Sequence, residues 1–142
     1  MIEQNFPRRF GRSFFALFAG FVLVVVLSIA TDIALHAAGV YPPQGQPMSA
    51  RLLVLATIYR TLFAIAGSYT TARLAPHHPM QHALLGGVIG LLLSLAGAVT
   101  TWNHPETHGA HWYPIALVIL AMPQAWLGGK IFAMQSRPEE AH

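Results

Sequence analysis

The chain has 142 residues, of which 54% are hydrophobic and only 9% are charged, and its formal net charge is +3. Soluble domains carry about 25% charged residues, and disordered chains combine low hydrophobicity with high charge, so the composition excludes both classes. The sequence contains no cysteine, which excludes disulfide scaffolds, thiolate metal sites and cysteine nucleophiles. What remains is an integral membrane protein with a single domain, residues 1–142.

Four apolar segments follow one another along the chain, and each is long enough to span a bilayer, which takes about 20 mostly apolar residues. They cover residues 14–38, 52–74, 83–102 and 113–132. We expect helices, because the bilayer core offers no water to hydrogen-bond an exposed backbone. The connectors are short and contain prolines, which cannot continue a helix. The sequence therefore predicts an all-α, four-helix transmembrane bundle made of two antiparallel hairpins.

The basic residues predict the orientation of these segments, since lysine and arginine are enriched on the cytoplasmic side of a membrane. A four-span arrangement puts both termini on the same side as six cations: Arg8, Arg9, Arg12, Arg73, Lys130 and Arg137. We therefore expect both termini in the cytoplasm. The first segment has the basic start and apolar core of a signal peptide, but it is too long for one, so we expect it to remain as a span.

Four aromatic residues flank the spans on the opposite side of the membrane. They are Tyr41, Trp102, Trp112 and Tyr113. Tyrosine and tryptophan are enriched at membrane–water interfaces, so we expect these residues to act as interface anchors.

Asp32 in the first segment and Arg60 in the second are charged residues within apolar stretches. A charge at such a position costs about 2.5–3.5 kcal/mol on insertion scales, so it usually faces the protein interior and has a partner. Consecutive antiparallel spans bring the two residues to similar depth, and we expect an ion pair between them. The pair has three interpretations: a proton or ion path, a buried recognition site for a charged ligand, and a structural clamp between two helices.

Four histidines are expected on the side of the membrane opposite the termini. They are His36, His104, His108 and His111, and Glu106 lies among them. Imidazole nitrogen is a ligand for zinc and copper, so one hypothesis is a zinc or copper site. The spacing matches no specific metal motif, and the other hypothesis is a polar loop at the headgroup level whose histidines titrate near neutral pH.

A stripe of small residues follows one face of the third segment. It consists of Gly86, Gly90, Ser94 and Ala98, at intervals of four residues. Small residues let the backbone of another helix approach closely. The stripe therefore predicts close packing, either against a helix of the same chain or against a second copy.

The sequence contains no arrangement typical of a catalytic or nucleic-acid site. Ser28, Ser68 and Ser94 lie within apolar segments without a histidine at matching depth. The eight basic residues do not gather into one patch, as nucleic-acid binding would require. We therefore expect a non-enzymatic protein that binds no nucleic acid.

Several short strings together point to a type of protein. They are Thr31-Asp32, Tyr41-Pro42-Pro43, Pro47-Met48, Tyr59-Arg60, Thr71-Ala72-Arg73-Leu74-Ala75-Pro76, Pro79-Met80, Trp112-Tyr113-Pro114 and Gly128-Gly129. With these strings, residues 16–132 resemble small, uncharacterised bacterial membrane proteins with four predicted spans. The resemblance implies a bacterial inner-membrane location and brings no activity, cofactor or substrate.

The spans take up nearly all of the chain, and this limits the functions that we expect. The leading hypothesis is a protein that associates within the lipid bilayer, with itself or with a larger membrane complex. A second hypothesis is a small transporter or channel subunit with a polar path at Asp32 and Arg60. A third is metal binding or pH sensing by the histidine cluster.

Overall fold

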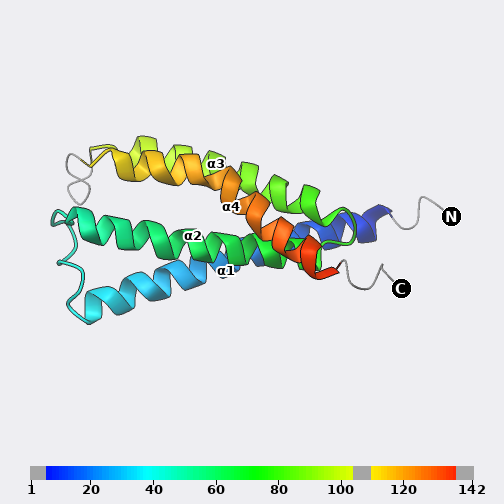
Figure 1. Ribbon diagram of the computed structural model, residues 1–142, viewed down its shortest axis with the longest axis horizontal. Helices are drawn as coiled ribbons and strands as arrows, with labels where there is room; N and C mark the ends of the chain where they lie inside the picture. The colour runs from blue at the N-terminus through cyan, green and yellow to red at the C-terminus, as the bar shows by residue number, and fades with distance from the viewer. Residues whose placement is uncertain (1–5, 104–109, 137–142) are drawn as a thin grey trace.

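The computed structural model describes residues 6–103 and 110–136, and side chains from residue 10 onwards. This part of the chain forms four helices: α1 (Phe6–Ala37), α2 (Ala50–Leu74), α3 (Pro79–Thr101) and α4 (Trp112–Ser136). The helices run up and down, so that the α2–α3 turn lies at the terminal end, where the chain enters and leaves, and the α1–α2 loop lies at the opposite, loop end (Figure 1). All four are long and apolar enough to span a membrane, which confirms the predicted all-α bundle.

Two of the helices begin well before the apolar segments that predicted them. α1 begins at Phe6 rather than at residue 14, and α3 begins at Pro79 rather than at residue 83. Apolarity marks only the part of a helix that lies in the bilayer core, whereas helical hydrogen bonding continues beyond it. Pro79 suits the first turn of α3, because a backbone donor is not needed there.

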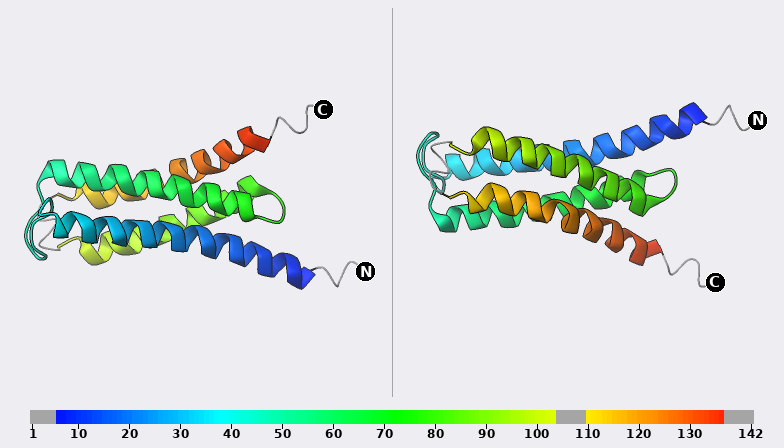
Figure 2. Two further views of the ribbon diagram at one scale, coloured as in Figure 1. Left: turned by 90° about the horizontal axis from the view of Figure 1, so that it is seen from below. Right: turned by 90° about the horizontal axis from the view of Figure 1, so that it is seen from above.

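Helix α2 is central to the packing of the bundle. It packs along both α1 and α4, and α3 packs along α4, but α1 and α3 make few contacts with each other. Towards the terminal end, α1 and α4 diverge from the bundle in both views of Figure 2. The bundle is therefore closed along three of its helix pairs and open between α1 and α3.

Small residues fill the interior, and large apolar residues face outwards. Val99 is 77% exposed and Phe10 is 73% exposed. A bilayer favours this distribution, because lipid covers the large side chains while small residues allow close contact between helices. The buried small residues include Ala16, Ala56, Ala72, Ala83, Ala121 and Ala125.

Glycine permits the closest approach of α2 to its two neighbours. A Cβ atom on Gly67 would lie 2.8 Å from the carbonyl oxygen of Gly20 on α1. A Cβ atom on Gly128 of α4 would lie 2.6 Å from the carbonyl oxygen of Ile65. Both distances are shorter than van der Waals contact allows, so a larger residue at either position would push two helices apart.

Candidate functional site

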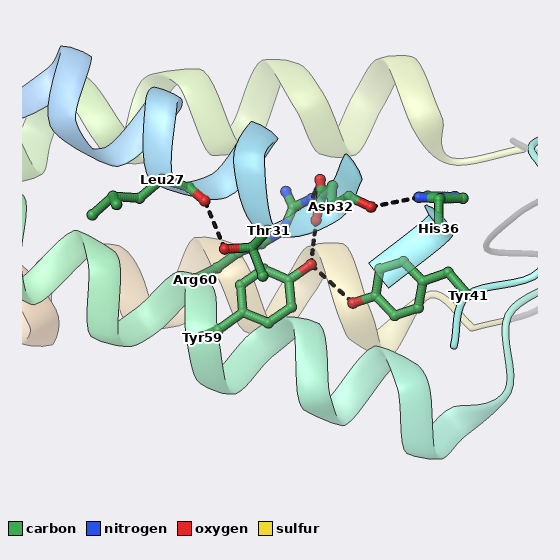
Figure 3. A network of polar contacts seen from close by, with 7 residues as sticks. All are labelled: Leu27, Thr31, Asp32, His36, Tyr41, Tyr59 and Arg60. Atoms are coloured by element: carbon green, nitrogen blue, oxygen red, sulfur yellow. Dashed lines mark hydrogen bonds and ion pairs between the residues drawn. The ribbon is translucent and has the colours of Figure 1, made fainter. Parts of the chain in front are cut away.

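The ion pair expected between Asp32 and Arg60 is present, and it joins α1 to α2. Arg60 Nη2 donates to Asp32 Oδ2 at 2.8 Å. The hydroxyl of Tyr59, the residue before Arg60 on α2, donates to the other carboxylate oxygen (Figure 3). Both oxygens of Asp32 therefore accept a hydrogen bond, which is what a carboxylate inside a membrane requires.

Tyr41 extends this network from the α1–α2 loop. Its hydroxyl lies 2.8 Å from that of Tyr59, and it is the donor, because the single hydroxyl hydrogen of Tyr59 already goes to Asp32. Tyr41 is only 5% exposed, and burial raises the pKa of its phenol. The expectation that Tyr41 is an interface anchor is therefore wrong, since its hydrogen bond holds it inside the bundle. Trp102 and Trp112 remain substantially exposed.

His36 closes the network at the end of α1. Its Nδ1 donates to the backbone carbonyl oxygen of Asp32 at 2.7 Å, and its ring lies edge-on to the ring of Tyr41. This arrangement orients His36 by contacts within the protein.

Arg60 has hydrogen-bond donors that the network does not use, because only one of its five N–H groups is bonded to Asp32. Its Nε is buried and has no hydrogen-bond partner among the residues described, so no molecule outside the chain can reach it. Its Nη1 also has no partner in the described chain, and the Arg60 side chain is 37% exposed. Inside a membrane neither lipid tails nor apolar side chains can accept from Nη1, so an acceptor outside the described chain would be favourable there.

Arg60 also lines a cavity that all four helices border. The cavity has a volume of about 450 Å³ and lies between α1 and α3, with α2 and α4 beneath it. Its wall on α1 is aromatic, with Phe14, Phe18 and Phe21, and its wall on α3 is small, with Gly86 and Gly90. A volume of this size lies in the range of small-molecule sites, about 300–1,000 Å³.

Four polar side chains, one from each helix, line the same cavity at similar depth. At about 1.5 Å per residue, they lie about 11–18 Å from the loop end of their helices. Besides Arg60, they are Ser28 of α1, Ser94 of α3 and Gln124 of α4. We call these four residues the polar belt.

The members of the polar belt differ from the other polar residues in the cavity. Ser68 donates to the carbonyl oxygen of Ala125 at 2.6 Å, and Thr71 donates to that of Ala16 at 3.2 Å. Within residues 6–103 and 110–136, the structure assigns no hydrogen bond to Ser28, Ser94 or Gln124. The polar belt thus combines available hydrogen-bonding groups with an apolar cavity, as binding sites do.

The stripe predicted on the third segment does not act as a single packing surface. Gly86, Gly90 and Ser94 line the cavity, while Ala98 lies in a separate hollow between α3 and α4. A Cβ atom on Gly90 would meet no atom of the described chain within 4 Å. Gly90 therefore borders open space beside α3, whereas a Cβ atom on Gly86 would lie at ordinary contact distance, 3.6 Å, from the side chain of Leu17 on α1.

A hydrogen bond between Ser13 and His82 joins α1 to α3 near the terminal end. His82 is 8% exposed, and its Nε2 lies 2.9 Å from Ser13 Oγ. Its Nδ1 donates to the backbone carbonyl oxygen of His78 at 3.1 Å, so Nε2 is the acceptor and the serine hydroxyl donates. The sequence does not predict this pair, because the two residues are far apart in the chain and neither lies in a recognisable motif.

The predicted metal site is not assembled in the described part of the chain. His104 and His108 lie outside the described residues. His111 stacks on Trp102, with ring centroids 4.1 Å apart. Residues 6–103 and 110–136 contain no group of three residues able to hold a metal ion, so the zinc or copper site stays a prediction.

Comparison with other proteins adds no assignment to this site. No protein-family model, curated protein or solved structure matches the chain. The function is therefore inferred from the contacts described above.

Proposed function

We propose that the protein is a small, non-enzymatic membrane-transport subunit that binds its ligand in the cavity between α1 and α3. We place it in the bacterial inner membrane, with both termini in the cytoplasm, following the distribution of its basic residues. Among the functions expected from the sequence, this is the one centred on the polar site of Asp32 and Arg60.

One observation carries the proposal: polar side chains from four helices, with hydrogen-bonding groups that no contact in the described chain uses, line one end of a largely apolar cavity. A purely structural clamp would need only the ion pair and the tyrosine hydroxyls, which already satisfy Asp32. The polar belt adds hydrogen-bonding groups that no contact within the described chain uses. Such capacity inside a membrane marks a binding position for a ligand or a translocated molecule.

The opening between α1 and α3 supports a route from the bilayer into this site. These two helices make few mutual contacts, and Gly90 leaves open space beside α3. A ligand dissolved in the membrane can enter sideways, without crossing the headgroup layer.

The test uses two glycines of α3 that differ in one respect. Gly90 lines the cavity and Gly97 does not, and a Cβ atom on either would meet no described atom within 4 Å. We expect wild-type protein and Gly97→Leu to copurify with the same small molecule, detected by mass spectrometry of an organic extract. Gly90→Leu should lose it. Identical extracts from all three proteins would overturn the proposal.

Self-association is a second candidate, supported by the surface near the loop end of α3. Ala98, Val99 and Trp102 line a shallow hollow there together with Ile115 and Val118 of α4. Val99 is 77% exposed. Native mass spectrometry of untagged protein should show a dimer that Ala98→Phe dissociates. A monomer in mild detergent and in lipid nanodiscs would count against this candidate.

A further inference from the structure

The charges around the cavity restrict the ligand that it accepts. Among the described residues that line it, Arg60 alone is charged, and its charge is balanced by Asp32 at 2.8 Å. The binding position is therefore close to neutral overall. A ligand with a net charge would remain without a counter-ion in the membrane interior, which is unfavourable. An uncharged ligand fits this balance.

The hydrogen-bonding groups restrict the ligand further. The unused Nη1 of Arg60 carries two N–H groups, which can only donate. Gln124 supplies two more N–H groups and one carbonyl oxygen, and the hydroxyls of Ser28 and Ser94 can donate or accept. Donors therefore outnumber obligatory acceptors, and Arg60 in particular requires a head group that accepts hydrogen bonds, as a carbonyl oxygen does.

The shape of the cavity favours a ligand with a single long chain. The lining continues along α1 from Ser28 to Phe14, a distance of about 21 Å. Over this length the α1 wall is apolar. The cavity therefore suits one extended apolar chain with its head at the polar belt.

We propose that the ligand is a lipid quinone, an uncharged molecule with one long apolar chain and a ring that carries carbonyl oxygens. The two carbonyls lie on opposite edges of the ring, so one can accept from Arg60 on α2 while the other accepts from Gln124 on α4. The chain then extends towards Phe14. This assignment rests on the proposed function, because it gives the chemistry of the ligand for the same cavity.

Decylubiquinone is a suitable probe for the purified full-length protein in detergent. Binding is measured by equilibrium dialysis, with palmitate as a charged single-chain competitor. We expect saturable binding of about one decylubiquinone per chain. Palmitate at equal concentration should displace little of it, because its carboxylate brings an unbalanced charge.

Three variants connect this binding to the cavity. Gly90→Leu fills the space beside α3 and should weaken binding at least about tenfold, while Gly97→Leu should leave it unchanged. Gln124→Leu removes a donor from the polar belt and should also weaken binding about tenfold, which corresponds to about 1.4 kcal/mol. Arg60→Lys keeps the cation beside Asp32 but removes the Nη1 donors, so it tests the carbonyl contact without leaving Asp32 unpaired.

The possible failures separate the two proposals. Tight palmitate or phospholipid binding that Gly90→Leu abolishes would overturn the quinone assignment and leave the cavity as the binding site. Equal losses in Gly90→Leu and Gly97→Leu would overturn both, because the effect would then not come from the cavity. Absence of binding by all of these probes, with nothing copurified, would also overturn both.

Discussion

At the residue scale, the two oxygens of Asp32 accept hydrogen bonds from two neighbouring residues of one helix. Arg60 reaches Oδ2 and Tyr59 reaches Oδ1. The sequence left three roles open for this pair: a proton or ion path, a recognition site for a charged ligand and a structural clamp. The contacts of Asp32 account for a clamp between α1 and α2, while the unused Nη1 of Arg60 and the place of this side chain in the cavity support the binding role that we propose.

Removing the carboxylate charge should destabilise the protein. Asp32→Asn weakens two charge-assisted hydrogen bonds and leaves Arg60 without its counter-ion, so we expect a loss of about 2–3 kcal/mol. Thermal unfolding in detergent, followed by circular dichroism, measures the change. Asp32→Arg combined with Arg60→Asp should recover much of the stability lost in either single variant. A double variant no better than the worse single one would contradict the pairing.

Tyr41 should make the stability depend on pH in the alkaline range. Burial raises its pKa above the ordinary value of 10.0, so the folded protein holds this proton more tightly than the unfolded chain does. The resulting stability is complete below pH 10 and falls as the pH rises above it. Tyr41→Phe cannot titrate there and should cost about 1 kcal/mol at pH 8. Urea unfolding of the two proteins at pH 8 and at pH 11 measures this effect. The difference between their free energies of unfolding should be smaller at pH 11, and an equal difference at the two pH values would contradict this assignment.

At the scale of the helix, glycine decides which pairs come into close contact. Gly20 and Gly67 bring the backbones of α1 and α2 together, whereas Gly90 and Gly97 of α3 have no close neighbour in the described chain. Periodicity alone placed the close contact on the α3 stripe. Every glycine looks alike in a sequence, and only the partner opposite it shows whether it serves a contact or a cavity.

Two alanine substitutions should therefore act in opposite directions. Gly67→Ala places a Cβ 2.8 Å from the carbonyl oxygen of Gly20, and we expect a loss of about 1–3 kcal/mol from the forced separation of the backbones. Gly97→Ala adds a Cβ in open space, and the better helix propensity of alanine should stabilise α3 by up to about 1 kcal/mol. Thermal unfolding of the two variants under identical conditions measures both. Equal shifts in the unfolding temperatures of the two variants would show that helix propensity, and not the contact with α1, determines the stability change.

At the scale of the whole molecule, the arrangement of the helices produces the cavity. α2 packs along α1 and α4, and α3 packs along α4, which leaves α1 and α3 with few contacts. The hydrogen bond between Ser13 and His82 joins these two helices near the terminal end. The opening therefore lies along the middle of the bundle, at the depth where lipid chains surround it.

The orientation of the bundle can be tested because the chain contains no cysteine. Gln44 lies in the α1–α2 loop and His77 in the α2–α3 turn, and both are exposed. We expect a membrane-impermeant maleimide to label Gln44→Cys in spheroplasts, and to label His77→Cys only after the membrane is broken. The opposite pattern would place both termini outside the cytoplasm.

The order of residues along the chain was enough to predict four apolar helices, an all-α bundle and the pairing of Asp32 with Arg60. These properties depend on the free energy of transferring each residue from water into lipid, which does not depend on how its helix packs. Only the folded chain decided that Tyr41 is buried, that Ser13 meets His82, and that most of the α3 stripe lines a cavity. Those outcomes depend on contacts between distant residues and on the separation of helix backbones, neither of which follows from local sequence.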